Sequence, residues 1–74
     1  MPPPFPSTAE HREVYRGREL VATAYEQRRG CWSYTWLVDG TLTGSSAPRA
    51  LLPSAEAALR RATLAARVAI DATG

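Results

Sequence analysis

The sequence predicts an α+β fold, in which an antiparallel meander of three to four β-strands is packed on one face by a single C-terminal α-helix. Turn-forming residues at 17–18 (Gly-Arg), 28–30 (Arg-Arg-Gly) and 39–40 (Asp-Gly) separate runs of β-branched and aromatic residues. Beyond residue 54 the chain is rich in Ala and follows a helical period instead. The 74 residues suffice for one small domain, and thirteen of them are Ala, so the predicted core is thin.

Four strands are predicted, at residues 12–16, 19–27, 31–39 and 41–45. A three-residue loop at 28–30 sets the register of the two long strands. This register brings small residues beside large ones, which cross-strand packing favours. The predicted pairs are Ala24 with Tyr34, Ala22 with Trp36, and Leu20 with Val38.

Side chains alternate along a strand, so this register divides the sheet into two faces. A slip of one residue in the 28–30 loop would move the tryptophans to the second face, and the pattern alone leaves that alternative open. The first face collects Tyr15, Leu20, Ala22, Ala24, Trp32, Tyr34, Trp36 and Val38. The second face collects Val14, Val21, Thr23, Tyr25, Cys31, Ser33, Thr35, Leu37 and Leu42.

Residues 55–72 predict a helix of about five turns, because neither Gly nor Pro interrupts them. Ser54 is the predicted N-cap, since Pro53 precedes it and Glu56 lies in the first turn. One stripe of this helix is nearly all Ala and lets the backbone approach the sheet face that carries the two tryptophans. Its members are Ala55, Ala58, Leu59, Ala62, Ala65, Ala66, Ala69 and Ile70.

Residues 1–10 predict a disordered Pro-rich leader, because four of the six prolines lie there and proline disfavours both helix and ladder pairing. Residues 11–74 then form the single sheet-and-helix domain. No apolar run approaches the length that spans a membrane, and no signal-peptide core is present. We therefore expect a cytoplasmic protein.

The residues that carry chemistry are too few for a catalytic or metal centre. One Cys (Cys31) and one His (His11) exclude a disulfide framework and a Cys/His zinc site. Cys31 opens a strand while His11 lies near the leader, so no nucleophile and base are predicted to meet. Phosphate-binding and dinucleotide-binding motifs are also missing. We expect a protein without enzymatic activity, cofactor or metal.

The charge balance is +2, and all nine basic residues are Arg. Arg is favoured for phosphate and base contacts, although an Arg-only set also follows from GC-rich codons. An alternative function is therefore nucleic-acid binding through the sheet face and the Arg-bearing hairpin turns. Its candidate contacts are Arg16, Arg18, Arg28 and Arg29. The net charge falls short of the dense basic stripe of a dedicated nucleic-acid binder, so this function ranks second.

Apolar residues outside the predicted core point to an interaction surface instead. A contiguous apolar row on so small a domain is typical of an interface, and homodimers are the commonest oligomers. The candidate interface comprises Val14, Val21, Leu37 and Leu42 on the second sheet face, with Leu64 and Val68 on the helix. We expect a small non-catalytic protein-interaction or regulatory module whose partner is another protein or a second copy.

Three stretches follow one another in an order that has a parallel elsewhere: His-Arg-Glu-Val-Tyr-Arg-Gly at 11–17, an aromatic hairpin at 31–40 and an Ala-rich helix at 55–71. In this the chain resembles a group of short proteobacterial proteins over roughly residues 11–72. The resemblance implies the same sheet-and-helix layout and a bacterial source, and it implies no activity.

Overall fold

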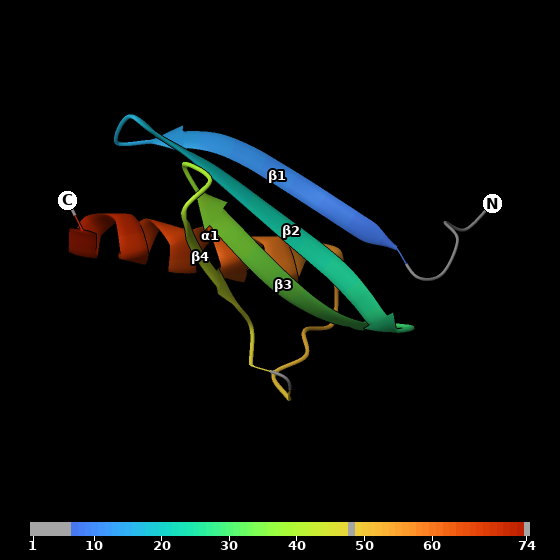
Figure 1. Ribbon diagram of the computed structural model, residues 1–74. Coiled ribbons are helices and arrows are strands. Elements are labelled where there is room, and N and C mark those ends of the chain that lie inside the picture. The colour runs from blue at the N-terminus through green and yellow to red at the C-terminus, as the bar shows by residue number, and fades with distance from the viewer. Residues whose placement is uncertain (1–6, 48, 74) are drawn as a thin grey trace.

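The computed structural model describes residues 7–47 and 49–73, which form a four-stranded antiparallel sheet and one helix (Figure 1). The strands follow the chain in the order β1-β2-β3-β4. Their bounds are Thr8–Tyr15 for β1, Arg18–Arg28 for β2, Cys31–Val38 for β3 and Leu42–Ser45 for β4; helix α1 spans Ala55–Thr73. The predicted α+β layout is confirmed.

The register of β2 and β3 is the predicted one, with Leu20 opposite Val38 and Ala24 opposite Tyr34. The turn between these strands differs in detail. It has two residues, Arg29 and Gly30, and the ladder shifts by one residue between Glu26 and Arg28. The extra residue that was expected in the loop lies inside β2 as a bulge, so the offset between the strands is unchanged.

The turn between β3 and β4 corrects the predicted position of Leu42. Asp39 (φ 50°) and Gly40 (φ 72°) adopt the two left-handed conformations that a type I′ turn requires. Thr41 belongs to the turn as well, where its N–H donates to the Val38 carbonyl (3.1 Å). Leu42 therefore lies opposite Val38 and packs against the core, because one additional turn residue moves it to the other face.

Strand β1 begins earlier than expected. Thr8 pairs with Tyr25, and the Glu26 N–H donates to the Ser7 carbonyl (2.9 Å), so residues 8–10 belong to the sheet and not to a disordered leader. Residues 8–10 continue the alternation between the two sheet faces that the rest of β1 follows. The Pro-rich composition of the preceding residues obscured this sign of a strand. Residues 1–6 of the predicted leader lie outside the described residues.

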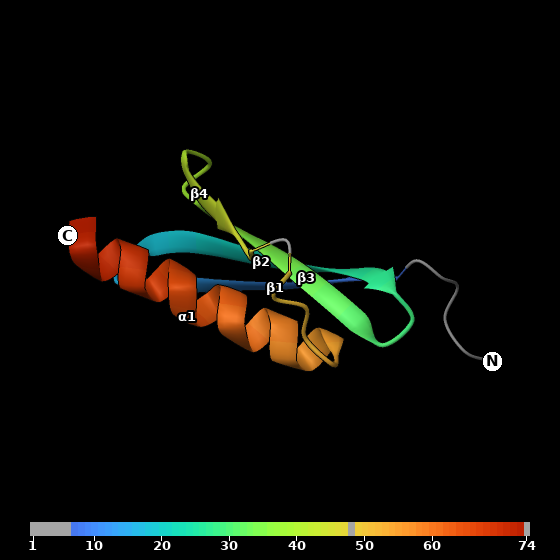
Figure 2. The ribbon, with the colours of Figure 1, turned by 90° about the horizontal axis from the view of Figure 1, so that it is seen from below.

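Helix α1 lies along one face of the sheet, mainly over β2 and β3 (Figure 2). Ser54 caps it as predicted, because its Oγ accepts from the Ala57 N–H (3.1 Å). The buried core is built mostly from small side chains, and Tyr34 and Trp36 border it. Its fully buried members are Leu20, Ala22, Ala24 and Val38 from the sheet and Ala58, Ala62, Ala66 and Ile70 from the helix.

The connector between β4 and α1 is tied back to β3. Leu52 and Trp32 form an antiparallel bridge in which each N–H donates to the carbonyl of the other residue (2.8 Å). This bridge holds the chain beside β3 just before Ser54, where the helix starts. Helix α1, which is the single helix of the part of the chain described here, is not long and apolar enough to cross a membrane.

Candidate interaction surfaces

The sheet face opposite α1 has no layer packed on it among the described residues (Figure 2). Cross-strand neighbours on β2, β3 and β4 build its centre in three rows. The rows are Val21, Leu37 and Thr43; Thr23, Thr35 and Ser45; and Tyr25 and Ser33. We call the eight central residues the open-face patch. They are Val21, Thr23, Tyr25, Ser33, Thr35, Leu37, Thr43 and Ser45.

Charged residues border the open-face patch and do not enter it. Glu10 and Arg12 lie on the neighbouring β1, Glu19 lies at the start of β2, and Arg28 lies at the other end of that strand. Arg12 donates from Nε to Glu10 Oε1 (2.8 Å) and its Nη1 lies 3.8 Å from Glu19 Oε1. The hydrogen bond that Arg12 donates to Glu10 raises the pKa of Arg12, so its guanidinium keeps its charge at this border.

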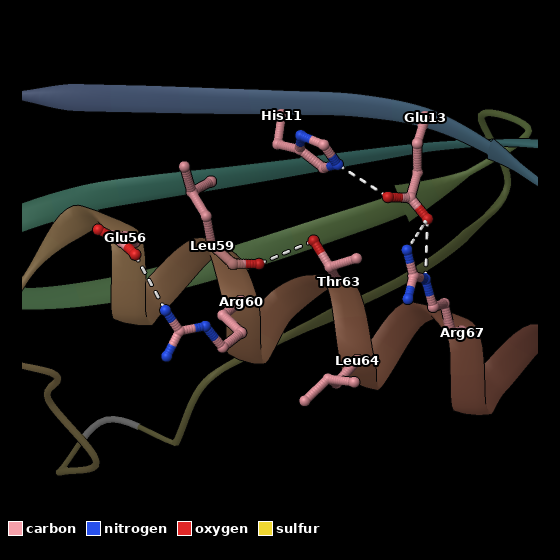
Figure 3. Close-up of a pocket in the computed structure, with 8 residues that line it drawn as sticks. All are labelled: His11, Glu13, Glu56, Leu59, Arg60, Thr63, Leu64 and Arg67. Atoms are coloured by element: carbon pink, nitrogen blue, oxygen red, sulfur yellow. Dashed lines mark hydrogen bonds and ion pairs between the residues drawn. The ribbon is translucent and has the colours of Figure 1, made fainter.

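A groove runs between β1 and α1 on the covered side of the sheet (Figure 3). It is open, with a volume of about 600 Å³, because the helix lies mainly over β2 and β3 and leaves the inner side of β1 exposed around His11. Leu59, Thr63 and Leu64 supply its less polar wall, while the Glu56–Arg60 pair (3.0 Å) lies toward one end.

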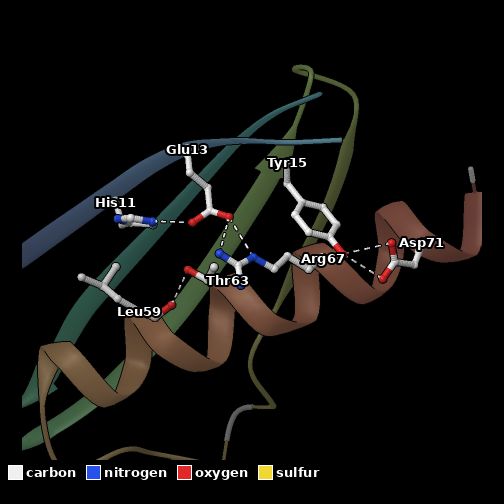
Figure 4. A network of polar contacts seen from close by, with 7 residues as sticks. All are labelled: His11, Glu13, Tyr15, Leu59, Thr63, Arg67 and Asp71. Atoms are coloured by element: carbon white, nitrogen blue, oxygen red, sulfur yellow. Dashed lines mark hydrogen bonds and ion pairs between the residues drawn. The ribbon is translucent and has the colours of Figure 1, made fainter. Parts of the chain in front are cut away.

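At the other end of this groove, Glu13 joins β1 to α1 (Figure 4). Its Oε1 accepts from His11 Nε2 (2.8 Å), and its Oε2 accepts from Arg67 Nε (2.8 Å) and Nη2 (2.7 Å). The hydrogen bond from His11, and then that from Arg67, lower the pKa of Glu13 against the opposing effect of desolvation. A carboxylate that is held ionised in this way is a weak base and is unsuited to accepting a proton in catalysis. Its role is structural, because it connects β1 to α1.

No local sequence pattern predicts this contact, because Glu13 and Arg67 are 54 residues apart. One signal was present: alternation from Tyr15 places Glu13 on the sheet face that the helix covers, where a carboxylate needs a basic partner. The described residues contain no cluster of three or more His, Cys, Asp and Glu side chains that would hold a metal ion.

Arg16 and Arg18, which are candidate nucleic-acid contacts, take part in ion pairs within the chain. Arg16 Nε lies 3.0 Å from Asp71 Oδ1, beside the Tyr15 hydroxyl, which donates to the same carboxylate (3.2 Å; Figure 4). Arg18 donates from Nε to Asp39 Oδ2 (2.9 Å) and from Nη1 to Thr73 Oγ1 (3.0 Å). Both contacts lie where α1 ends.

The other two candidate contacts lie at the opposite end of the sheet (Figure 1). Arg28 ends β2 and Arg29 follows in the turn, so the whole strand, about 33 Å long, separates them from Arg18. The structure therefore does not bring the four arginines into one basic surface.

The six candidate interface residues fall into three places. Val14 (73% exposed), Val21 and Leu37 (39% exposed) share the open sheet face. Leu64 and Val68 lie on the exposed side of α1, across the molecule from that face. Leu42 packs against the core. A single flat interface can include the first group or the second, and not both.

Comparisons with known proteins give no match from which a function could be inferred. No protein-family model, no curated protein and no solved structure matches the chain. The resemblance to short proteobacterial proteins thus stays a prediction.

Proposed function

We propose that this chain is a non-catalytic protein-interaction module, and that its open-face patch docks onto the same patch of a second copy. The observation that supports this is the composition of the patch. Its eight residues include no charged side chain, whereas 22% of the whole chain is charged. An uncharged centre that contains an aromatic residue and is bordered by charges is the usual anatomy of a protein interface.

A second copy is the partner that suits this surface best. Two such patches related by a two-fold axis bring apolar and hydroxyl side chains together and place no like charges at the centre. The chain also gains from being covered, because a domain of this size with an Ala-rich core is marginally stable alone. Docking would bury Val21, Leu37 and Tyr25, which the fold leaves partly exposed.

The area of the open face indicates how large an interface two copies can form. The whole open face has four strands about 4.8 Å apart, and at about eight residues per strand on average, rising about 3.3 Å each, it covers about 19 Å by about 26 Å. Two copies then bury on the order of 1,000 Å², which is at the lower end for specific interfaces. We therefore expect association that depends on concentration, with a dissociation constant in the micromolar range.

Leu37→Glu tests the docking surface. It places a charge at the centre of the patch, at a side chain that is already 39% exposed, so the fold should persist. We expect the dissociation constant of the face-to-face contact to rise by at least about tenfold. Sedimentation velocity over a concentration series measures it, with circular dichroism to verify the fold.

Leu64→Glu is the matched control, because it makes the same change at an exposed leucine on α1. It should sediment like the wild type. Identical sedimentation of the wild type and Leu37→Glu at every concentration would refute docking through the open-face patch.

A further inference from the structure

Strand β1 forms one edge of the sheet and is eight residues long, whereas β4 at the other edge has four. The outer side of β1 has no strand paired to it among the described residues. Such an edge offers a row of backbone donors and acceptors to another strand. A second strand added there would extend the sheet without disturbing any pairing that the fold already makes.

The charges on β1 restrict which strand can be added. Glu10, Arg12 and Glu13 discourage pairing with an arbitrary apolar strand, since charged side chains are a common protection of sheet edges. The same charges favour a strand that places opposite charges in register with them. Among the described strands, β1 of a second copy meets this condition in one antiparallel register.

That register is centred on His11. Residues directly opposite each other in a sheet point to the same face. A two-fold axis between two identical antiparallel strands must therefore lie midway between the two copies of one residue, so that this residue is paired with its own copy. With His11 on the axis, Glu10 faces Arg12 of the other copy, and the same pair forms twice. Centring on Glu10, Arg12 or Glu13 instead sets that residue against its own copy, which is a repulsive pair.

The groove beside β1 leaves room for this pairing. Helix α1 packs mainly over β2 and β3, and the inner side of β1, where His11 lies, borders the groove (Figure 3). The two-fold axis is perpendicular to the sheet, so both helices stand on the same side of the extended sheet, each above its own β2 and β3. The helices thus stay clear of the seam.

We propose that β1 pairs antiparallel with β1 of a second copy, in the register centred on His11, and forms a continuous eight-stranded sheet. This contact uses a different surface from the open-face patch and does not rest on it. A chain that makes both contacts assembles beyond a dimer, and it loses one step of assembly when either contact is broken.

Disulfide trapping tests the register directly. In a Cys31→Ser background, His11→Cys should form a covalent dimer under mild oxidation, because directly opposite Cα atoms lie about 4.5–5.5 Å apart, within reach of a disulfide. Glu10→Cys and Arg12→Cys in the same background should cross-link at least about tenfold more slowly, since each lies diagonally from its own copy, at about 7–8 Å. Fastest cross-linking at Glu10 or Arg12, or equal rates at all three positions, would overturn the proposal.

A charge exchange tests the pairing without cysteine. Arg12→Glu should weaken the β1 contact at least about tenfold, because it places two acidic residues opposite each other, and Glu10→Arg with Arg12→Glu should restore it. If only the open-face contact exists, Arg12→Glu sediments like the wild type and Leu37→Glu becomes monomeric. If only the β1 contact exists, Leu37→Glu sediments like the wild type. A double exchange that fails to restore association would contradict the register.

Discussion

Glu13 is one of the residues through which β1 contacts α1. Its carboxylate is largely shielded from solvent and accepts hydrogen bonds from one side chain on its own strand, His11, and one on α1, Arg67. Because both partners favour the ionised form, the pKa of Glu13 lies below its ordinary value of 4.5. The contribution of Glu13 to the contact between β1 and α1 therefore depends on pH.

Glu13→Gln should lower the free energy of unfolding by about 1 kcal/mol at pH 7, because it removes a charged acceptor from two hydrogen-bonded partners. The folded state lowers the pKa, so the stability that Glu13 contributes is present above pH 4.5 and is lost as the pH falls through the folded pKa. Urea unfolding of the wild type and the variant from pH 7 to pH 3 should give curves that converge on the acid side.

Glu56→Gln is the control for that experiment, since its pair with Arg60 is exposed on one helix and contributes little. Asp39, whose pKa is lowered by Arg18 and by the Glu19 N–H, keeps its own pH dependence in every variant. A gap between wild type and Glu13→Gln that stays constant from pH 7 to pH 3 would show that charge is not its source.

At the scale of elements, β4 is held against β3 by a close contact between a glycine and a tryptophan. Trp36 and Gly44 are direct cross-strand partners, and a Cβ on Gly44 would lie 2.5 Å from Cζ2 of the indole. The indole ring therefore lies directly against the backbone of β4. A Cβ atom at position 44 would be closer to the ring than Cβ atoms come to other atoms in real proteins. Gly44 is needed here for its missing side chain, since its φ is not in the left-handed region.

Gly44→Ala should destabilise the fold by about 1–3 kcal/mol, as overpacking of a well-packed contact does. The atoms that clash belong to the indole, so Trp36→Phe should reduce the cost of the added methyl group. Thermal or urea unfolding of the two single variants and the double variant gives the coupling energy. Additive effects would show that Trp36 is not the neighbour that must move.

For the whole molecule, the two proposed contacts would make stability depend on association as well as on the single chain. Association that binds the folded chain and not the unfolded one raises the midpoint of unfolding with protein concentration. We expect this rise in the wild type, and its loss in a variant that combines Leu37→Glu with Arg12→Glu. Differential scanning calorimetry at low and high concentration measures it, and a midpoint independent of concentration in the wild type would contradict self-association.

The sequence predicted the larger arrangement better than the details at its ends. The pairing of Ala with large residues favoured the register of β2 and β3 that the structure has, and it left a slip of one residue open. The face of Leu42 was wrong because it depended on whether Thr41 is a turn residue, and turns of two and of three residues carry the same Asp-Gly signal. The start of β1 at Thr8 was missed because composition was weighed above alternation.

The candidate site was the less predictable part. Exposed apolar residues are readable from a sequence, but whether they share a surface depends on the side of the sheet that the helix takes. Leu37 and Leu64 were grouped together, and the fold places them on opposite sides. The Glu13–Arg67 contact and the groove beside it required the angle at which α1 crosses the sheet, which no local pattern contains.

The strand order also determines how the chain is assembled in time. Each strand pairs with its neighbours along the chain, and each turn is two or three residues long, so closing the sheet costs little loop entropy. Helix α1 follows all four strands, and on a ribosome it is synthesised after them. Until it emerges, the hairpins expose both the surface meant for the helix and the open face. We expect the sheet face under α1, which carries the core, to be accessible to other proteins until the helix packs on it.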